Sequence, residues 1–372
     1  MTDCLIVGGG VIGLSLAYEL AEQGARVRCI DAGSPGAEAS WAGAGIVPPV
    51  GPHASSPLDR LLALSNRLHA QWHEQLREET GIDNGFRRTG GIYLARDPAT
   101  AAELERQIAG WQRDGVTVER LNSPAAIGAV EPVLTPRDPL ARCCFLPDEA
   151  QLRNPRHLHA LLAALARRGV EVSPDLPAED FVVSGTRVTA VRTPAGEITA
   201  GSFCIAGGPW SMALAARLGP PPAIVPIRGQ IALLAEGAPT LGRIVNERLC
   251  YLVPRGDGHV LVGSTEEDVG FDRGTTSEAI QKLLDFAYSL VPTLAAARIE
   301  RTWAGLRPVS PDGRPYLGRI AGYDNAYLAA GHGRAGLILS PITAVAMSRL
   351  ILGQPPVVDL DPFRVDRSLP PR

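Results

Sequence analysis

Residues 3–13 read Asp3-Cys4-Leu5-Ile6-Val7-Gly8-Gly9-Gly10-Val11-Ile12-Gly13. An apolar run passes directly into the spacing Gly-x-Gly-x-x-Gly. This order predicts a strand, a tight turn and a helix, the local structure that holds a dinucleotide. Glycines let the backbone approach a pyrophosphate, and the helix N-terminus offers it free N–H groups and a partial positive charge. The residues of this turn expected to contact the nucleotide are Gly8, Gly10, Val11, Ile12 and Gly13.

The acid that follows the second apolar run favours the same interpretation. That run ends at Ile30 and is followed by Asp31 and Ala32. In a dinucleotide-binding unit, an acid at this place accepts hydrogen bonds from the ribose hydroxyls of the adenosine half. An ordinary strand–turn–helix unit, which is the alternative, has no need of an acid after its second strand.

The composition limits the classes of function. A chain of 372 residues, 45% of them hydrophobic, is long enough for two interlocked domains. Its net charge of −3 gives no electrostatic attraction to nucleic acid or anionic membrane. The first apolar stretch has no basic segment before it, unlike a signal peptide, and we find no uncharged apolar run long enough to span a bilayer. We therefore expect a cytoplasmic protein without nucleic-acid or membrane partners.

The cysteines, histidines and lysine of the chain argue against disulfide, metal and Schiff-base chemistry. The six cysteines form no C-x-x-C pair and mostly lie in apolar runs, so we expect buried thiols and no disulfide reductase. The seven histidines show no metal-ligand spacing, and we expect no metal. Lys282 is the only lysine and lies in a stretch typical of a surface helix, which argues against a Schiff-base cofactor.

Hydrophobic periodicity predicts alternating helices and strands. Helices are expected at 55–79, 100–115, 155–169 and 277–290, strands at 90–94, 203–206 and within 226–264, and a hairpin at 180–197. The last third of the chain returns to α/β character. We therefore predict an α/β fold: a Rossmann-like domain built from discontinuous segments, plus a second domain with a mainly antiparallel sheet.

Three further segments rich in small residues are candidates for contact with a bound group. The segment 40–45 lets the backbone press against a flat ligand, or else forms only a tight loop. The segment 207–211 closes a buried strand where a dinucleotide crosses the edge of an open sheet. The segment 331–336 precedes a helix, which we expect to begin with Ser340 as N-cap and Pro341 at its first position.

Six motifs together resemble a known family. They are GGGVIG (8–13), SWAGAG (40–45), AGGPWS (206–211), CYLVPR (250–255), WAGLRPVSPDGRPYLG (303–318) and GHGRAGLILSP (331–341). Their order resembles that of the flavin-dependent D-amino-acid oxidase superfamily, and within it the glycine oxidases of the thiamine-biosynthesis type. The resemblance runs from residue 3 to about residue 353.

The resemblance implies that FAD is bound non-covalently by a domain of discontinuous segments. We place the FAD-binding domain at 1–86, 149–216 and 302–356, the substrate domain at 87–148 and 217–301, and a C-terminal tail at 357–372. No cysteine follows Cys250, which argues against a covalent flavin link. The residues implied to contact FAD are Gly8, Gly10, Val11, Ile12, Gly13, Asp31, Ala32, Ser40, Ala42, Gly43, Gly45, Gly207, Trp210, His332, Gly333, Arg334, Gly336, Leu337 and Ile338.

The resemblance also implies three catalytic residues. Arg307 matches the arginine that holds the substrate carboxylate with two parallel hydrogen bonds. Tyr251 matches the tyrosine whose hydroxyl reaches the same carboxylate. Arg334 matches a third polar residue beside the substrate and the flavin.

Other residues near these motifs have less specific interpretations. Arg255 and Arg314 are interpreted as surface or turn arginines. Trp303 and Trp210 are interpreted as packing residues. Glu266, which follows a strand, forms either a solvated acidic turn or a contact with the substrate amine.

The expected activity is the oxidation of glycine and other small amino acids. The substrate C–H bond is aimed at flavin N5 for hydride transfer, and dioxygen reoxidises the flavin to give hydrogen peroxide. The imine product feeds thiazole synthesis for thiamine or hydrolyses to glyoxylate and ammonia. Three alternatives stay open: a D-amino-acid or secondary-amine dehydrogenase (sarcosine- or proline-type) using a quinone or other acceptor, a tRNA-modifying flavoprotein, and a flavin-binding sensor without turnover. The resemblance alone suggests a homo-oligomer.

Overall fold

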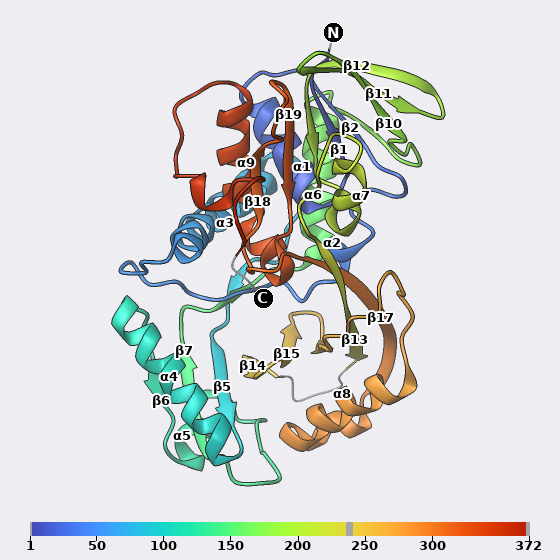
Figure 1. Cartoon of the computed structure of the whole chain (residues 1–372). Coiled ribbons are helices and arrows are strands. Elements are labelled where there is room, and N and C mark those ends of the chain that lie inside the picture. The colour runs from blue at the N-terminus through green and yellow to red at the C-terminus, as the bar shows by residue number, and fades with distance from the viewer. Residues whose placement is uncertain (1, 236–240, 370–372) are drawn as a thin grey trace.

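The computed structural model describes residues 2–235 and 241–369 of the chain. Two large sheets form separate layers, and Figure 1 shows the first above the second. The helices α1, α3, α6 and α9 lie with the first sheet, and α4, α5 and α8 lie with the second.

The first sheet begins with the apolar run of the glycine motif. Its strand order is β10-β11-β12-β1-β2-β9, with β19 paired to β12 and β18 paired to β19. The strands β9, β2, β1, β12 and β19 are parallel, so the centre of the sheet is buried on both faces. The bounds are β1 Thr2–Val7, β2 Val27–Ile30, β9 Glu171–Ser173, β10 Asp180–Ser184, β11 Arg187–Thr193, β12 Gly196–Ile205, β18 Tyr316–Arg319 and β19 Ala326–Ala330.

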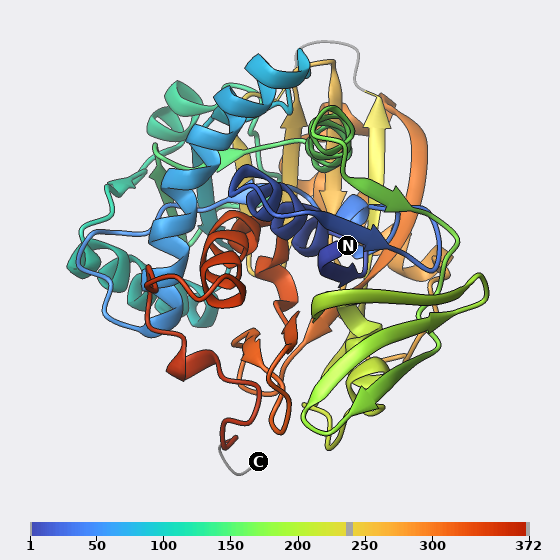
Figure 2. The ribbon, with the colours of Figure 1, turned by 90° about the horizontal axis from the view of Figure 1, so that it is seen from above.

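Four helices cover this sheet. The helix α1 (Val11–Glu22) packs between α6 (Asn154–Arg167) and α9 (Gly336–Ile351), and α3 (Pro57–Thr80) packs on α9. Seen from above, α1 and α9 lie side by side (Figure 2). Because α1 is enclosed in this way, nine of its twelve residues are buried, and its N-terminus is held at a fixed place at the end of β1.

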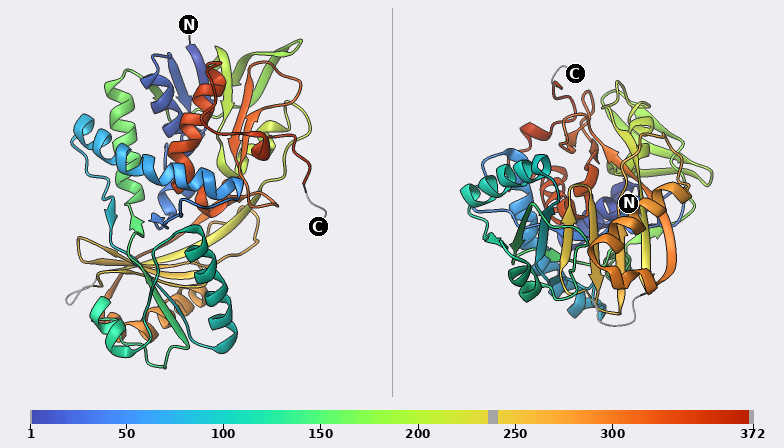
Figure 3. Two further views of the ribbon diagram at one scale, coloured as in Figure 1. Left: turned by 90° about the vertical axis from the view of Figure 1, so that its left-hand side faces the viewer. Right: turned by 90° about the horizontal axis from the view of Figure 1, so that it is seen from below.

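The second sheet is antiparallel except where β14 meets β5. Its order is β17-β13-β16-β15-β14-β5-β7-β6. One face packs on α8 (Ser277–Leu290), and the other faces the first layer (Figure 3). The bounds are β5 Gly91–Ala95, β6 Glu119–Arg120, β7 Arg142–Leu146, β13 Val225–Ala235, β14 Ile244–Glu247, β15 Cys250–Arg255, β16 His259–Gly263 and β17 Arg298–Val309.

Short elements complete the fold. The strands β3 (Ile46–Val47), β8 (Ala150–Gln151) and β4 (Arg87–Arg88) form a separate three-stranded sheet in that order. The remaining elements are α2 Ala39–Ala42, α4 Pro98–Asp114, α5 Pro124–Val130, α7 Ser211–Ala215, η1 Gly208–Trp210, η2 Pro292–Ala296, η3 Gly333–Ala335 and η4 Asp361–Phe363.

The predicted fold class is confirmed, because the first sheet draws its strands from distant parts of the chain and the second is mainly antiparallel. The domain bounds stay a prediction. The boundary placed between residues 301 and 302 falls inside β17, all of which belongs to the second sheet. Of the six cysteines, all are free thiols and only Cys250 is partly exposed.

The helix α9 begins earlier than we expected. It starts at Gly336 rather than at Pro341, which lies inside the helix. Pro341 has no N–H, so the carbonyl of Leu337 loses its helical partner. The Ser340 hydroxyl donates to that carbonyl at 2.9 Å, and His69 Nε2 lies 3.2 Å from it. The proline is therefore tolerated within the helix because side chains replace the missing hydrogen bond.

The helix α9 is unusually apolar. Among the described residues, Gly333–Ile351 is long and apolar enough by length and composition to cross a membrane, although it contains Arg334 and Arg349 and is therefore not an uncharged run. Of its most apolar window, 56% is buried. Its contacts with α1 and α3 account for this surface as part of the core.

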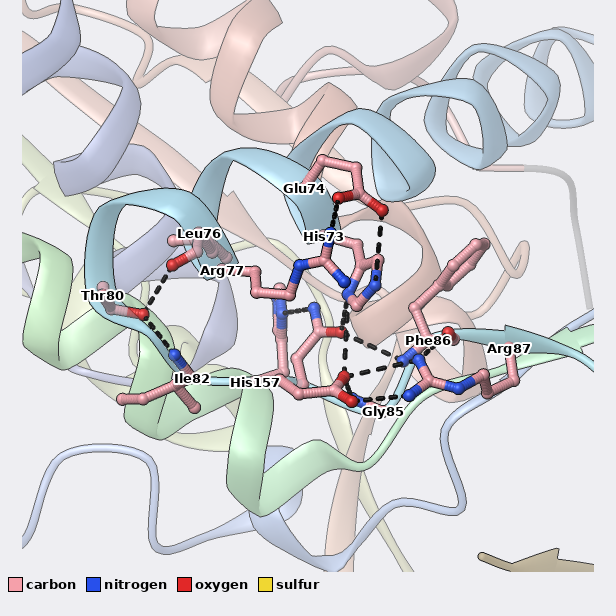
Figure 4. A network of polar contacts seen from close by, with 12 residues as sticks. His73, Glu74, Leu76, Arg77, Thr80, Ile82, Gly85, Phe86, Arg87 and His157 are labelled. Atoms are coloured by element: carbon pink, nitrogen blue, oxygen red, sulfur yellow. Dashed lines mark hydrogen bonds and ion pairs between the residues drawn. The ribbon is translucent and has the colours of Figure 1, made fainter.

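Polar side chains fix the end of α3 against α6, as Figure 4 shows. His73 Nδ1 lies 2.7 Å from Asn84 Oδ1, and Asn84 Nδ2 lies 3.2 Å from His157 Nδ1 on α6. The helix ends at Gly81, which has a φ of 77° and donates its N–H to the Arg77 carbonyl, and the Thr80 hydroxyl donates to the Leu76 carbonyl. Burial lowers the pKa of His157 to about 3, so this imidazole is neutral.

Candidate active site

A cavity of about 1030 Å³ lies between the two sheets. Its walls come from the ends of β1, β2 and β12, the segment 38–48, the inner face of the second sheet and the start of α9. Twenty of the twenty-one predicted catalytic and cofactor-contacting residues line this cavity. They are Gly8, Gly10, Val11, Ile12, Asp31, Ala32, Ser40, Ala42, Gly43, Gly45, Gly207, Trp210, Tyr251, Arg307, His332, Gly333, Arg334, Gly336, Leu337 and Ile338.

 

Gly13 is the predicted contact residue that lies outside this lining. A Cβ atom at Gly13 would lie 1.9 Å from the carbonyl oxygen of Gly8. The third glycine of the motif therefore allows the helix to pack closely on the strand and turn, and its expected contact with the cofactor stays a prediction.

The glycine turn fits a pyrophosphate. Gly8 has a φ of 117°, and a Cβ atom there would lie 2.4 Å from the Ala206 carbonyl oxygen. The N-cap residue Gly10 provides no side-chain cap, and the first turn of α1 has no acidic residue. This N-terminus lines the cavity, and its partial positive charge suits an anionic ligand.

Asp31 lies at the end of β2 and supports the turn. Its Oδ2 accepts a hydrogen bond from the Gly9 N–H at 2.6 Å, and its Oδ1 accepts from the Gly33 N–H at 2.9 Å. Burial raises the pKa of the carboxyl group. Each oxygen retains acceptor capacity, so the expected contact with a ribose remains open to it.

The small residues of the segment 40–45 are required by close packing. A Cβ atom at Gly43 would lie 2.6 Å from Asn154 Nδ2, and one at Gly45 would lie 1.9 Å from the Leu152 carbonyl oxygen. The Ser40 hydroxyl accepts from the Val11 N–H at 2.9 Å. This segment is therefore pressed between α6 and the N-terminus of α1, where it lines the cavity.

Arg307 and Tyr251 lie on the face of the second sheet that lines the cavity. Arg307 donates to the Ser264 hydroxyl at 2.6 Å and to the Thr265 carbonyl at 3.0 Å. Burial lowers the pKa of Arg307 below its ordinary value. A Cβ atom at Gly229, on the neighbouring strand, would lie 2.3 Å from the guanidinium. The glycine thus leaves the space in which the arginine lies.

Arg334 lines the same cavity and faces Glu266. Its Nη1 lies 3.4 Å from Glu266 Oε1, and both side chains are partly exposed. Of the two interpretations of Glu266, this geometry favours an acidic turn, here one that pairs with an arginine. An exposed pair of this kind contributes little to stability.

His332 is buried beside the start of α9. Its Nε2 lies 3.1 Å from the Thr343 hydroxyl. Burial lowers its pKa to about 3, so the ring is neutral. The side chain is therefore turned to the protein interior, in agreement with a backbone contact to the cofactor.

The interpretation of Arg255 as a surface or turn arginine was wrong. Its guanidinium donates to the Ala44 carbonyl at 2.6 Å and to Gln151 Oε1 at 2.9 Å. Burial lowers its pKa to about 10. Because these partners lie on the segment 40–45 and on β8, Arg255 ties the second sheet to the cofactor-facing loop.

Trp303 and Trp210 differ in how they pack. Trp303 donates from Nε1 to the Ala42 carbonyl at 3.1 Å and packs on Trp41, as expected of a packing residue. Trp210 is 38% exposed, and its ring lies 5.7 Å from that of Phe271, which is 51% exposed. Trp210 is therefore no core residue but part of the cavity wall.

Sequence reasoning missed Tyr93, Asn246 and Glu149, which belong to no motif. Tyr93 and Asn246 line the cavity beside Tyr251. Glu149 lies behind them, fully buried, and accepts from Tyr93 Oη at 2.6 Å and from Asn246 Nδ2 at 3.0 Å. Asn154, which donates to the Ser40 carbonyl at 2.7 Å, was also missed.

Glu149 is expected to make stability depend on pH. Burial raises its pKa from 4.5 to about 7. Because the folded-state pKa is the higher one, the group stabilises the fold fully at low pH, and this contribution is lost as pH rises through about 7. A pKa difference of this size between the folded and the unfolded state corresponds to about 3 kcal/mol.

The measurement is the free energy of unfolding at pH 5 and pH 8 for the wild type and for Glu149→Gln. We expect the variant to lose less stability than the wild type between the two pH values. Glu247→Gln is the matched control, since Glu247 is partly exposed and paired with Arg96. Equal losses in the wild type and Glu149→Gln would contradict the prediction.

The cavity has a glycine turn suited to a nucleotide on one wall. It has a buried arginine and a tyrosine on another wall, and this combination is typical of flavin-dependent oxidoreductases. Residues 3–350 match the model of the family described as DAO, FAD dependent oxidoreductase. The chain belongs to this family and uses FAD.

Several individual proteins are similar to this chain over nearly its whole length. The chain is 36% identical to "Glycine oxidase" of Pseudomonas aeruginosa, covering 96% of this chain and 97% of the relative. It is similar to the crystal structure of glycine oxidase from Geobacillus kaustophilus, with a TM-score of 0.93, 33% identity and 99% coverage of both chains. It is 32% identical to "Bifunctional protein ThiO/ThiG" of Synechocystis sp., covering 95% of this chain but 52% of that longer protein.

Proposed function

We propose that this protein oxidises glycine and other small amino acids with FAD as the hydride acceptor and dioxygen as the oxidant of the reduced cofactor. The single observation that carries the proposal is that Arg307 and Tyr251 line the same cavity as the glycine turn between β1 and α1. The relatives named glycine oxidase support the choice of substrate.

Arg307 is proposed to hold the substrate carboxylate. The guanidinium carries five N–H donors in a planar fork, and its bonds to Ser264 and Thr265 fix the plane of that fork. A charged hydrogen bond from it contributes about 1.5–3 kcal/mol. The Tyr251 hydroxyl reaches the same carboxylate, so the two side chains together set the orientation of the α-carbon.

FAD supplies the hydride acceptor when it is bound. The residues proposed to hold its pyrophosphate lie in the turn and at the start of α1, with two more from the neighbouring segment: Gly8, Gly10, Val11, Ile12, Ser40 and Gly43. The N-terminus of α9, where Gly336, Leu337 and Ile338 line the cavity, offers a partial positive charge to the negative charge that reduction creates.

The products proposed are the imine, which hydrolyses to glyoxylate and ammonia, and hydrogen peroxide. The relatives that combine this unit with a second one support a role in supplying the imine for thiamine thiazole synthesis. A dehydrogenase that uses another electron acceptor is the second candidate, and the experiment below separates the two.

The test is anaerobic mixing of the yellow holoprotein with glycine, sarcosine, D-alanine and D-proline, followed by admission of air. We expect glycine to bleach the flavin absorbance, and air to restore it with release of peroxide. Bleaching without recovery in air would identify a dehydrogenase instead. A flavin that none of the four amines reduces would overturn the proposal.

A further inference from the structure

One row of residues crosses the second sheet on the face that lines the cavity. The backbone register pairs Tyr93 with Asn246, Asn246 with Tyr251, and Tyr251 with Gly263. Paired residues of neighbouring strands project their side chains to the same face, about 5 Å apart. Asn246 is therefore the direct neighbour of the tyrosine proposed to bind the substrate carboxylate, and it lines the same cavity.

A buried carboxyl group fixes the orientation of the Asn246 amide. Glu149 accepts from Asn246 Nδ2 at 3.0 Å and from Tyr93 Oη at 2.6 Å. It lies over Gly91, where a Cβ atom would come within 2.4 Å of the carboxyl carbon. The Asn246 amide turns its nitrogen toward Glu149, as the hydrogen bond from Nδ2 shows. This is the orientation that an ionised carboxylate requires, because it has only acceptor atoms, and Glu149 is ionised above a pH of about 7.

The amide oxygen of Asn246 is left with a free acceptor. Among the residues that the structure describes, no side chain or backbone group donates a hydrogen bond to it. The residue is 9% exposed, and it lines the cavity. A polar group in such a position favours a ligand that carries a donor.

We propose that Asn246 binds the amino group of the substrate through its amide oxygen, and that Glu149 is the positioning residue that holds the amide in this orientation. This inference rests on the proposed function and deepens it. Arg307 and Tyr251 select a carboxylate, whereas Asn246 selects a substrate whose α-carbon also carries an N–H donor.

The experiment compares two ligands in the FAD-loaded enzyme. The dissociation constant of glycine is taken from the concentration dependence of anaerobic flavin reduction. The dissociation constant of acetate, a carboxylate without an amine, is taken from its perturbation of the flavin absorbance. In Asn246→Leu we expect the constant for glycine to rise about tenfold or more, the equivalent of one hydrogen bond, and that for acetate to change less than about twofold.

A second variant tests the positioning role. In Glu149→Gln the new amide can pair with Asn246 in either orientation, so the oxygen faces the cavity for only part of the time. We expect a smaller loss of glycine affinity than in Asn246→Leu, again without a loss of acetate affinity. Glu247→Gln is the matched control and lies on β14 beside Asn246. We expect it to leave both dissociation constants unchanged, because Glu247 pairs with Arg96.

The outcomes separate this inference from the proposed function. Equal weakening of glycine and acetate, or no weakening of either, would overturn the role of Asn246 while the wild type still oxidised glycine. If Asn246→Leu does not fold, Glu149→Gln decides by the same comparison. If no amine reduces the wild-type flavin, the proposed function fails, and the amine site fails with it.

Discussion

Arg307→Lys is expected to remove most of the affinity for amino-acid substrates while FAD stays bound. An ammonium group cannot form two parallel hydrogen bonds to a carboxylate. It also cannot bond Ser264 and Thr265 in the plane that the guanidinium fixes. With one or two charged hydrogen bonds lost, we expect the dissociation constant of glycine to rise by about 10²-fold or more.

The measurement is anaerobic flavin reduction over a range of glycine concentrations, with the flavin spectrum and FAD content as checks. Arg298→Lys is the control, since Arg298 is exposed at the start of the same strand. Glycine kinetics in Arg307→Lys that match those of Arg298→Lys would show that Arg307 does not hold the substrate.

The second large effect is expected for Gly13→Ala. The new Cβ atom would lie 1.9 Å from the Gly8 carbonyl oxygen and 3.2 Å from Ile6 Cγ2. Both the turn and α1 are enclosed by packed elements, so neither can move without loss of core contacts. We expect a loss of about 4 kcal/mol or more in the free energy of unfolding and no retained FAD.

Thermal unfolding and the FAD content of the purified protein measure this effect. Gly128→Ala is the matched control: it lies in α5, and nothing lies within 4 Å of a Cβ atom there. Alanine also favours a helix more than glycine does, so the control should be as stable as the wild type or slightly more stable. A Gly13→Ala protein that stays yellow and stable would contradict the packing argument.

The sequence by itself determined the elements whose causes are local. The strand, turn and helix of residues 2–22 follow from an apolar run and glycines within a few residues of one another. The hairpin of β10 and β11 was predictable in the same way. All but one of the predicted site residues line the cavity, because a backbone that must approach a ligand closely needs small residues at fixed spacings.

Two predictions made from local sequence were wrong, namely the start of α9 at Pro341 and the exposure of Arg255. Pro341 is a helix-start signal by itself, yet it lies inside α9, which begins at Gly336. The Leu337 carbonyl, which loses its helical partner at Pro341, accepts from the Ser340 hydroxyl and lies beside Nε2 of His69, far away in the chain. Arg255 resembles any strand-end arginine in sequence. Its burial follows from carbonyl and amide partners on other elements.

Only the tertiary structure brought Tyr93, Glu149, Asn246 and Tyr251 together. They lie on β5, beside β8, on β14 and on β15, separated by up to 158 positions in the numbering of the chain. Strand register decides which side chains share a face and which are neighbours on it, and register depends on pairing between distant segments. No motif spacing encodes that pairing. Asn246, which we propose to bind the substrate amine, could therefore be found only from the assembled sheet.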